Sequence, residues 1–493
     1  MGTRMAKESL QLAEYAAGLS YRDIPGPVLQ RAKDAIADTI AAIAFGAHLP
    51  WSRMIVNYAS QRGKGGKAYV FGPGGPRLQA PAAALANGTL AHAFEMDNLT
   101  WPNTGVHPGA TMAMPALAVA QERGLSGRAL LEAVVAGSEL MIRVGRATKH
   151  NNETRGFHAP GTTGPYGSAA AVGRLLKFDA PMMLNALGIA GSTSAGLLEF
   201  AKSGTGAMVK RLHLGRAAES GILAASLAEQ GFTGPVSVLE GQFGFLNVYC
   251  GEHDLPALTR GLGSEWASLR IMLKRFPMHI TSHTSVQAIE DLRREHGYAG
   301  GDVASIHVAG NPKMATVNNI PEPADLMLAQ YSLPFCVALA HYKDPRDPAS
   351  FNTKSFNDPE IRALARLVTI TVSDEAKAAH GHTIASTVTV TLKDGRVLTR
   401  RVDSFKGTPE QPLSVEEMRE KFLLLTRHCD GKAMARLFER LQDLENEKSL
   451  DFVKVDAAKS HATKPKKAVT VKRAAAAQRK PVKRTASKRA RAR

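Results

Sequence analysis

Apolar residues recur at helical spacing through most of the first 270 positions. Positions 10–19 and 27–45 carry them three or four residues apart, and Pro27 suits the first turn of a helix. A short strand interrupts this pattern at 67–72. Residues 1–270 therefore predict the first part of a large all-helical domain. Its further helices, which are rich in Ala, Gly and Ser, are predicted at 109–122, 127–147, 166–177, 181–200 and 207–230.

The pattern changes beyond residue 271, where β-branched residues cluster or alternate. Asp394-Gly395 is typical of the tight turn of a hairpin. Residues 271–405 therefore predict a smaller α+β domain, inserted into the helical one as a lid. The predicted strands are 305–309 and 367–372, the predicted hairpin is 386–402, and the predicted helices are 284–296 and 325–341.

Amphipathic helices return near the end of the chain, at 414–430 and 432–447. Ser414 and Glu417 have the spacing of a capping box, which marks the start of the first of them. Residues 406–456 are expected to complete the helical domain. The predicted fold class is mainly α: a large all-helical domain with an inserted α+β lid domain, followed by a disordered basic tail.

The charge of the chain is concentrated in that tail. The whole sequence has 62 Lys+Arg and 44 Asp+Glu, a formal net charge of +18. Residues 457–493 contain 14 Lys+Arg and no acidic residue, which leaves 48 basic and 44 acidic residues, or +4, for residues 1–456. The low-complexity tail is predicted to be disordered. It either contacts polyanions such as nucleic acid without reading sequence or is a solvated segment with no dedicated partner.

Composition and motifs exclude several classes of protein. No stretch approaches the roughly 20 apolar residues of a membrane span, and the N-terminus lacks the apolar core of a secretory signal. Cys250, Cys336 and Cys429 lie far apart, which argues against disulfides and iron–sulfur clusters and favours the cytoplasm. No HExxH motif, Walker A loop or dinucleotide fingerprint is present, so no cofactor is predicted.

Ionisable residues gather in four stretches rich in Gly, Pro and small residues, at 87–110, 156–171, 203–221 and 273–283. Loops of this composition commonly carry active-site groups. A single His, Lys or Arg is more often structural or solvated, but the accumulation predicts one site. The residues concerned are His92, Glu95, Asp97, His107, His158, Lys210, Arg211, His213, Lys274, Arg275, His279 and His283.

Cations bind the carboxylates of a di- or tricarboxylate, and histidines of near-neutral pKa remove a proton next to a carboxylate or protonate a departing hydroxide. Zinc would be a competing use of His, Asp and Glu. It is not predicted, because no pair of histidines at i, i+4 has a third ligand nearby.

The four stretches, in this order, resemble the MmgE/PrpD family, and the resemblance covers about residues 7–450. The motifs are NGT-x-AHA with HP-G, then GFH with G-x-x-G-SAAA, then K-x-LH-x-G-x-AA, then LKRFP-x-H. The family includes 2-methylcitrate dehydratase, cis-aconitate decarboxylase and some dicarboxylate epimerases. The resemblance implies a large helical domain with a smaller α+β lid, a homodimer, and no metal or organic cofactor.

Residue by residue, the resemblance assigns catalytic roles to positions of this chain. Glu95 stands where the family has the first Asp of HxxDxDD, Asp97 keeps the second, and Asn98 replaces the third. Thr100 corresponds to the family threonine, and Thr316 stands where decarboxylase-like members carry a Tyr. The implied catalytic residues are His107, His158, Lys210, Lys274, His279, Glu95 and Asp97, and the implied substrate-binding residues are Arg275, Thr100 and Thr316.

Three functions follow as hypotheses. The first is a cofactor-independent lyase, of the hydro-lyase type, that acts on a small di- or tricarboxylate such as a 2-methylcitrate-like acid, by dehydration or decarboxylation. The second is an epimerase or isomerase of a dicarboxylate, with two bases on opposite sides of one carbon. The third is a protein associated with DNA or another polyanion through residues 457–493.

Overall fold

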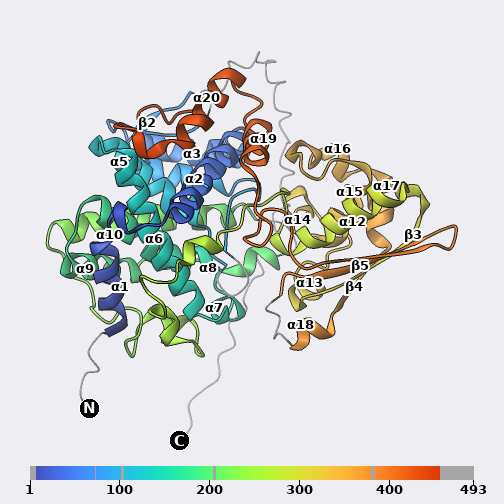
Figure 1. The fold of residues 1–493 in the computed structure, drawn as a ribbon, viewed down its shortest axis with the longest axis horizontal. Helices are drawn as coiled ribbons and strands as arrows, with labels where there is room; N and C mark the ends of the chain where they lie inside the picture. The colour runs from blue at the N-terminus through green and yellow to red at the C-terminus, as the bar shows by residue number, and fades with distance from the viewer. Residues whose placement is uncertain (1–6, 73, 101–104, 204–206, 379–382, 456–493) are drawn as a thin grey trace, which may run out of the picture. The chain divides into compact units, whose positions relative to one another are not determined.

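Residues 7–258 are mainly helices that pack around one large apolar core, drawn from blue to green in Figure 1. The computed structural model describes residues 7–72, 74–100, 105–203, 207–378 and 383–455. These helices are α1 (Lys7–Gly18), α2 (Gly26–Gly46), α3 (Pro50–Arg62), α4 (Ala80–Ala91), α5 (Met114–Arg123), α6 (Gly127–Ala147), α7 (Asn151–Thr154), α8 (Ala159–Leu175), α9 (Ala180–Gly191), α10 (Val209–Glu229) and α11 (Phe245–Tyr249).

Small residues determine how closely the central helices α4, α6, α8 and α10 approach one another. A Cβ added to Gly137 of α6 would lie 2.6 Å from the carbonyl oxygen of Gly167 in α8. A Cβ added to Gly221 of α10 would lie 2.1 Å from the Cβ of Ser168. Larger side chains would separate these helices, so the Ala, Gly and Ser content seen in the sequence is what permits this packing.

The C-terminal helices return to this core. Helices α19 (Val415–Leu425) and α20 (Gly431–Gln442) both pack against α2. Ser414 caps α19 with the predicted capping box, in which its hydroxyl accepts from the Glu417 N–H at 3.2 Å. We call residues 7–258 together with 415–455 the helical part.

Between these segments lies a four-stranded sheet with its own apolar core, which is partly yellow and orange in Figure 1. The strand order is β4-β3-β5-β6, with β3 parallel to β4 and antiparallel to β5, and with β5 antiparallel to β6. We call residues 283–402 the α+β part. Its strands and helices are α12 (His283–His296), β3 (Val303–Gly310), α13 (Pro312–Thr316), α14 (Leu326–Ala329), α15 (Leu333–Tyr342), α16 (Thr353–Phe356), α17 (Pro359–Arg366), β4 (Val368–Val372), α18 (Asp374–Ala378), β5 (Ser386–Leu392) and β6 (Val397–Val402).

The predicted hairpin is present as β5 and β6, and Gly395 in its turn has a φ of +90°, which favours glycine. The predicted strand at 67–72 is a short antiparallel pair, β1 (Ala68–Tyr69) with β2 (Arg77–Leu78). The fold class is confirmed: the protein is mainly helical, with a small α+β part. The tail at 457–493 lies outside the described residues.

Two predicted helices end early, and both breaks matter for the site. The helix predicted at 181–200 stops at Gly191, because the chain then turns and pairs with another segment, His158 N–H donating to Gly196 O at 3.0 Å. The helix predicted at 325–341 is divided into α14 and α15, with Tyr331 between them. Ser332 caps α15 ahead of Pro334, a start signal that the apolar spacing had obscured.

The described residues between 7 and 455 form a single unit, so the domain boundaries at 270 and 405 stay predictions. Two large apolar cores do occur among the described residues: one mainly in the helical part, and one built from residues 276–402 together with Phe94. A third, small cluster consists of Leu99, Met272, Ile280 and Phe405. Among the described helices, none has the length and apolar character needed to cross a membrane.

Candidate active site

The turn after α4 presents the first group of polar side chains. His92 ends the helix, and Glu95 follows with a φ of +58°, a left-handed conformation that is uncommon outside glycine. Gln330 of the α+β part holds this turn, because its amide donates to the carbonyls of Phe94 at 3.1 Å and of Pro277 at 2.8 Å. A strained backbone held by its surroundings is frequent at functional sites.

Glu95 lies between two buried lysines. Its carboxylate pairs with the ammonium of Lys210, at the start of α10, and with that of Lys274 at 3.0 Å. Burial opposes ionisation of Glu95, but the two lysines and His92 outweigh it and hold its pKa well below the usual range. Burial, opposed by Glu95 and aided by Lys274, lowers the pKa of Lys210 to about 8. The three side chains therefore form a buried, charged group with an excess of positive charge.

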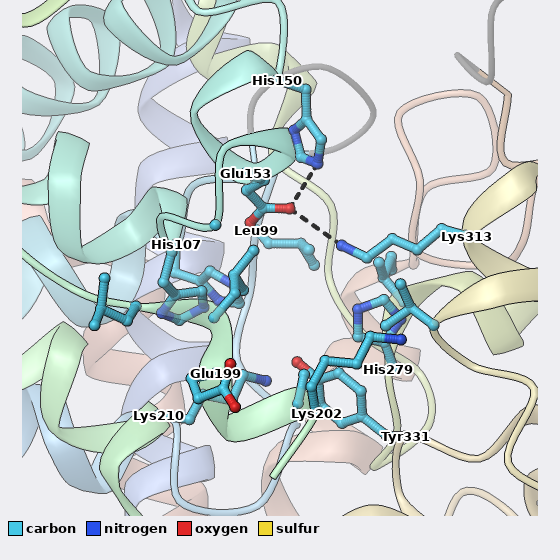
Figure 2. A pocket seen from close by; sticks show the side chains of 18 of the residues that line it. Leu99, His107, His150, Glu153, Glu199, Lys202, Lys210, His279, Lys313 and Tyr331 are labelled. Carbon is cyan, nitrogen blue, oxygen red and sulfur yellow. Dashed lines mark hydrogen bonds and ion pairs between the residues drawn. The ribbon is translucent and has the colours of Figure 1, made fainter. Parts of the chain in front are cut away.

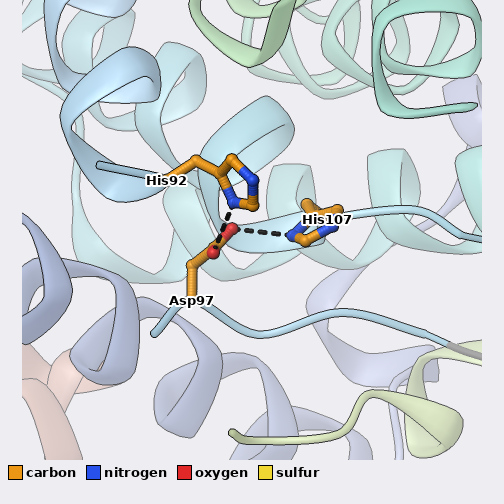
Figure 3. Close-up of side chains that lie close together, drawn as sticks. All are labelled: His92, Asp97 and His107. Carbon is orange, nitrogen blue, oxygen red and sulfur yellow. Dashed lines mark hydrogen bonds and ion pairs between the residues drawn. The ribbon is translucent and has the colours of Figure 1, made fainter. Parts of the chain in front are cut away.

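Asp97 bridges two histidines behind this group (Figure 3). Its two carboxylate oxygens lie 2.7 Å from His92 Nδ1 and 2.8 Å from His107 Nδ1. Since a carboxylate only accepts, both histidines donate from Nδ1. Burial lowers the pKa of His107 to about 4 despite Asp97, so its ring is neutral near pH 7.

His92, Asp97 and His107 are also the described residues that could hold a metal ion, with ligand atoms within 4.8 Å of one another. Both Nδ1 atoms are already engaged by Asp97, so a cation would have to replace two short hydrogen bonds. The sequence predicted no metal, and that stays a prediction.

His158 is the N-cap of α8 and lies next to His213 on α10. Their Nδ1 atoms are 3.0 Å apart, so one ring donates and the other accepts. Burial and the neighbouring His213 hold the pKa of His158 well below its usual range. Burial and Lys210 lower that of His213 to about 4. This pair is neutral near pH 7.

His279 comes from the segment that leads into the α+β part. Its ring centroid is 4.6 Å from that of Tyr331, and the Lys210 ammonium lies 4.6 Å from the Tyr331 ring centroid. Burial, with Lys313 and Lys210, holds the pKa of His279 well below its usual range. Burial raises the pKa of Tyr331, so its phenol stays protonated.

A second ion-paired group joins the helical part to the α+β part. Glu153 of α7 lies 2.7 Å from His150 Nε2 and 3.1 Å from Lys313 Nζ of α13. Burial opposes ionisation of Glu153, but Lys313 and His150 outweigh it and lower its pKa. This pairing crosses the cavity between the two parts.

These groups line a cavity of about 510 Å³, which is within the size range of small-molecule sites. Figure 2 shows His107 and His279 on opposite sides of it, with Lys210 and Tyr331 below and Glu153 above. Of the residues predicted from the sequence, the cavity is lined by Glu95, His107, His158, Lys210, Lys274 and His279.

The other predicted residues lie elsewhere. Asp97 lies behind the wall, where it orients the two histidines. Arg275 lines a separate surface cavity, where its guanidinium lies 3.7 Å from Glu290 Oε2, whereas the neighbouring Lys274 is paired with Glu95 in the site. Thr316 is exposed and donates to the Pro312 carbonyl at 2.9 Å. Thr100 is buried and is not among the described residues that line the cavity.

Asn98 has a structural role in the helical part. It is fully buried, and its amide donates to Asp38 Oδ2 at 3.0 Å and to Thr39 Oγ1 at 2.9 Å, while it accepts from the Gly109 N–H. Asp38 is paired with Lys421. Since Asn98 lies next to Asp38, an Asp in its place would put a second carboxylate beside that of Asp38.

Sequence reasoning missed several residues of the cavity wall. His150 and Glu153 lie between the predicted helix at 127–147 and the stretch at 156–171. Lys202 lies just beyond the helix predicted at 181–200, and Tyr331 falls inside the helix predicted at 325–341. The start signal at Ser332 would have placed Tyr331 in a loop, but no sequence signal pointed to Lys313. The missed residues with ionisable or polar side chains are His150, Glu153, Thr154, Glu199, Lys202, Lys313 and Tyr331.

Neutral imidazoles and buried lysines around one cavity are the groups of an enzyme with acid–base chemistry. Comparison with known families agrees: models of the MmgE/PrpD N-terminal domain and of the MmgE/PrpD C-terminal domain match residues 10–257 and 276–445. The chain belongs to the MmgE/PrpD family and is an enzyme.

Similar curated proteins cover nearly the whole chain. Cis-aconitate decarboxylase of Aspergillus terreus is 29% identical over 461 residues, covering 87% of this chain and 91% of that protein. The Homo sapiens cis-aconitate decarboxylase is 29% identical over 445 residues, covering 87% and 90%. The Mus musculus protein of the same name is 27% identical over 449 residues, covering 87% and 89%.

Proposed function

We propose that this chain is a cofactor-independent lyase that acts on a small di- or tricarboxylate, such as a 2-methylcitrate-like acid, by dehydration or decarboxylation. The observation that carries the proposal is the Glu95–Lys210–Lys274 group, which lines the same cavity as three neutral histidines. The names of the relatives, cis-aconitate decarboxylases, support a tricarboxylate.

A carboxylate of the substrate binds at Lys210 and Lys274. Both ammonium groups are almost fully buried, so their attraction to an anion is screened little by water. Glu95 neutralises only one of these two charges, and a substrate carboxylate completes the balance. Glu95 also keeps the two lysines in place while the cavity contains no substrate.

The histidines supply the bases of the reaction. In a dehydration, a neutral imidazole removes the proton next to a carboxylate, the electron pair forms a carbon–carbon double bond, and a protonated group donates to the departing hydroxide, which leaves as water. In a decarboxylation, the bond to one carboxylate breaks, carbon dioxide leaves, and the electron pair left on carbon takes up a proton from a protonated group of the cavity, such as the Lys210 ammonium or the Tyr331 phenol. The neutral rings in this cavity that are placed to remove a proton are those of His107, His158 and His279.

A second candidate function is epimerisation of a dicarboxylate. It is favoured by one observation: His107 and His279 lie on opposite sides of the cavity (Figure 2). Both rings are neutral near pH 7 in the empty cavity, because burial lowers both pKa values. Epimerisation needs one of the two rings to take up a proton together with the substrate, whose negative carboxylates favour the charged imidazole. The neutral ring then removes the proton from a carbon next to a carboxylate, and the protonated ring returns a proton to the opposite face of that carbon.

A panel of acids in deuterated water, followed by NMR, tests both functions: 2-methylcitrate, citrate, cis-aconitate, epoxysuccinate and iminosuccinate. A lyase forms or consumes a double bond, with loss of water or carbon dioxide. An epimerase incorporates deuterium at a stereocentre without either loss. No reaction of any of these acids with the full-length chain would contradict both.

Lys274 and Arg275 are adjacent cations, and replacing each in turn gives a matched pair of variants to assay on the acid of the panel that reacts. Lys274→Met removes a cation from the cavity, and we expect kcat/KM to fall about 100-fold or more. Arg275→Met removes the next cation, which points away from the cavity, and we expect little change. Unchanged activity in both Lys274→Met and His158→Ala would contradict the proposed site.

A further inference from the structure

Two buried polar side chains lie behind His279, on the side away from the cavity. Thr281 Oγ1 is 2.9 Å from His279 Nδ1 and 3.0 Å from Asn318 Oδ1. Thr281 is 1% exposed and Asn318 is 0% exposed, so water does not complete these contacts. His279, Thr281 and Asn318 therefore form a chain of hydrogen bonds whose proton positions the geometry determines.

Asn318 determines the direction of this chain. Its amide nitrogen donates to the carbonyl oxygen of Tyr331 at 2.8 Å, which fixes the orientation of the side chain. The atom that faces Thr281 is then the amide oxygen, which can only accept. The hydroxyl of Thr281 has one proton, and it goes to Asn318. Thr281 Oγ1 must therefore accept from the other neighbour, and His279 donates from Nδ1.

The opposite arrangement satisfies fewer groups. The backbone N–H of Thr281 lies 3.4 Å from His279 Nδ1, and this contact would suit a lone pair on Nδ1. In that arrangement one of the two shorter contacts, at 2.9 Å or 3.0 Å, would place two lone pairs opposite each other with no proton between them. Buried polar groups left without a partner are costly, so two short hydrogen bonds outweigh one long one.

We propose that the Asn318–Thr281 relay locks His279 as the tautomer with its proton on Nδ1, which leaves the Nε2 lone pair free to act as the general base of the reaction. Thr281 and Asn318 are positioning residues, and His279 is the residue that touches substrate. The role of base rests on the function proposed above, whereas the tautomer does not.

The surroundings of Nε2 agree with this role. His279 lines the cavity, and its Nε2 makes no hydrogen bond with any residue in the described part of the chain. Burial and the cations Lys313 and Lys210 keep the ring neutral, so the lone pair is available near pH 7. The structure defines His158 less strictly, because its Nδ1 faces the Nδ1 of His213 and either ring can donate.

The tautomer can be observed without a substrate. The full-length protein is labelled with ¹⁵N-histidine, and the His279 ring is assigned from the signals lost in His279→Gln. Long-range ¹H–¹⁵N spectra distinguish a proton on Nδ1 from one on Nε2. We expect the Nδ1–H form in the wild type and in Thr281→Ser, which keeps the hydroxyl. We expect a mixture of the two forms in Thr281→Val, which has the same shape without the hydroxyl.

Kinetics on the active acid of the panel provides the second measurement. We expect kcat of Thr281→Val to fall about 10- to 100-fold with KM changed less than about threefold, because the variant loses the orientation of the base and keeps the carboxylate site. Thr281→Ser, which keeps the hydroxyl, should retain most of the wild-type kcat. An equal loss of kcat in Thr281→Ser and Thr281→Val would contradict the relay, since it would indicate a packing defect only.

The two proposals fail in different ways. A proton on Nε2 of His279 in the wild type, or the same tautomer in wild type and Thr281→Val, would overturn the relay whatever the activity. Absence of any reaction with the panel would contradict the proposed function, and the spectra would still decide the relay. A shift of tautomer in Thr281→Val with unchanged kcat would show that His279 is not the base.

Discussion

Lys274 Nζ lies 3.0 Å from Glu95 Oε2, although 179 positions separate the two residues in the sequence. The contact depends on a two-residue β-bridge, in which Leu99 and Met272 exchange backbone hydrogen bonds of 3.1 and 2.7 Å. That bridge brings the turn after α4 beside the segment that enters the α+β part. The carboxylate-binding lysine is thereby held by the same loop that carries Glu95.

Replacing Glu95 should expose the cost of two unpaired buried cations. We expect Glu95→Gln to lower the free energy of unfolding by about 3–5 kcal/mol, because both lysines lose their partner. Glu95→Asp keeps the charge and should lose less. Thermal unfolding with and without citrate checks this, since a bound polycarboxylate should restore part of the loss in Glu95→Gln. An unchanged unfolding temperature in Glu95→Gln would contradict the charge balance described above.

Asp97 should act through the histidines that it orients. Asp97→Asn replaces a pure acceptor by an amide, so the Nδ1–H of His107 or of His92 faces a donor and the ring can turn or change tautomer. We expect kcat to fall about 100-fold or more, with a smaller change in KM. The double variant Asp97→Asn with His107→Ala should lose little beyond His107→Ala alone. Additive losses would show that Asp97 acts elsewhere.

The alkaline limb of the pH profile should report Lys210. Its pKa is lowered to about 8, so its charge disappears as the pH rises through that value, and with it the attraction for a carboxylate. We therefore expect kcat/KM to decline above about pH 8. Lys210→Arg keeps its charge to much higher pH and should shift this limb upward. If the limb stays in place, another group is responsible.

Stability should decrease on the acid side of neutrality. The unfolded chain takes up a proton at His107 near 6.5, whereas the folded chain does so only near 4. Between these values the unfolded state binds more protons, so stability rises with pH and is lost as the pH falls from 6.5 to 4. This residue alone contributes a slope of up to about 1.4 kcal/mol per pH unit. Urea titrations at several pH values check it, and His107→Gln should reduce the slope.

Chelation should leave the enzyme active. His92 and His107 already donate to Asp97, and the proposed chemistry needs only protons and cations of the chain. We expect dialysis against EDTA to leave kcat unchanged and elemental analysis to find no bound metal in molar amounts. Loss of activity that zinc restores would instead assign these three residues to a metal site.

The sequence predicted much of the fold and part of the site. Apolar spacing located α2, α6, α10, the strands and the hairpin, because these elements depend on local periodicity and on burial of one face. Motif spacing led to His107, His158, Lys210, Lys274 and His279, all of which line the cavity. It could not separate Lys274 from Arg275, since the difference lies in the direction in which each side chain points.

Tertiary structure decided the rest. Glu153 and Lys313 come from distant segments and pair only once the helical and α+β parts pack together. The neutral state of the histidines likewise depends on burial, which no local pattern encodes. By itself the sequence determined which chemical groups are present and which elements carry them. Long-range packing decides which partners these groups have, where their protons lie and whether each side chain faces the cavity. Each of these properties is set by atoms contributed from elsewhere in the fold.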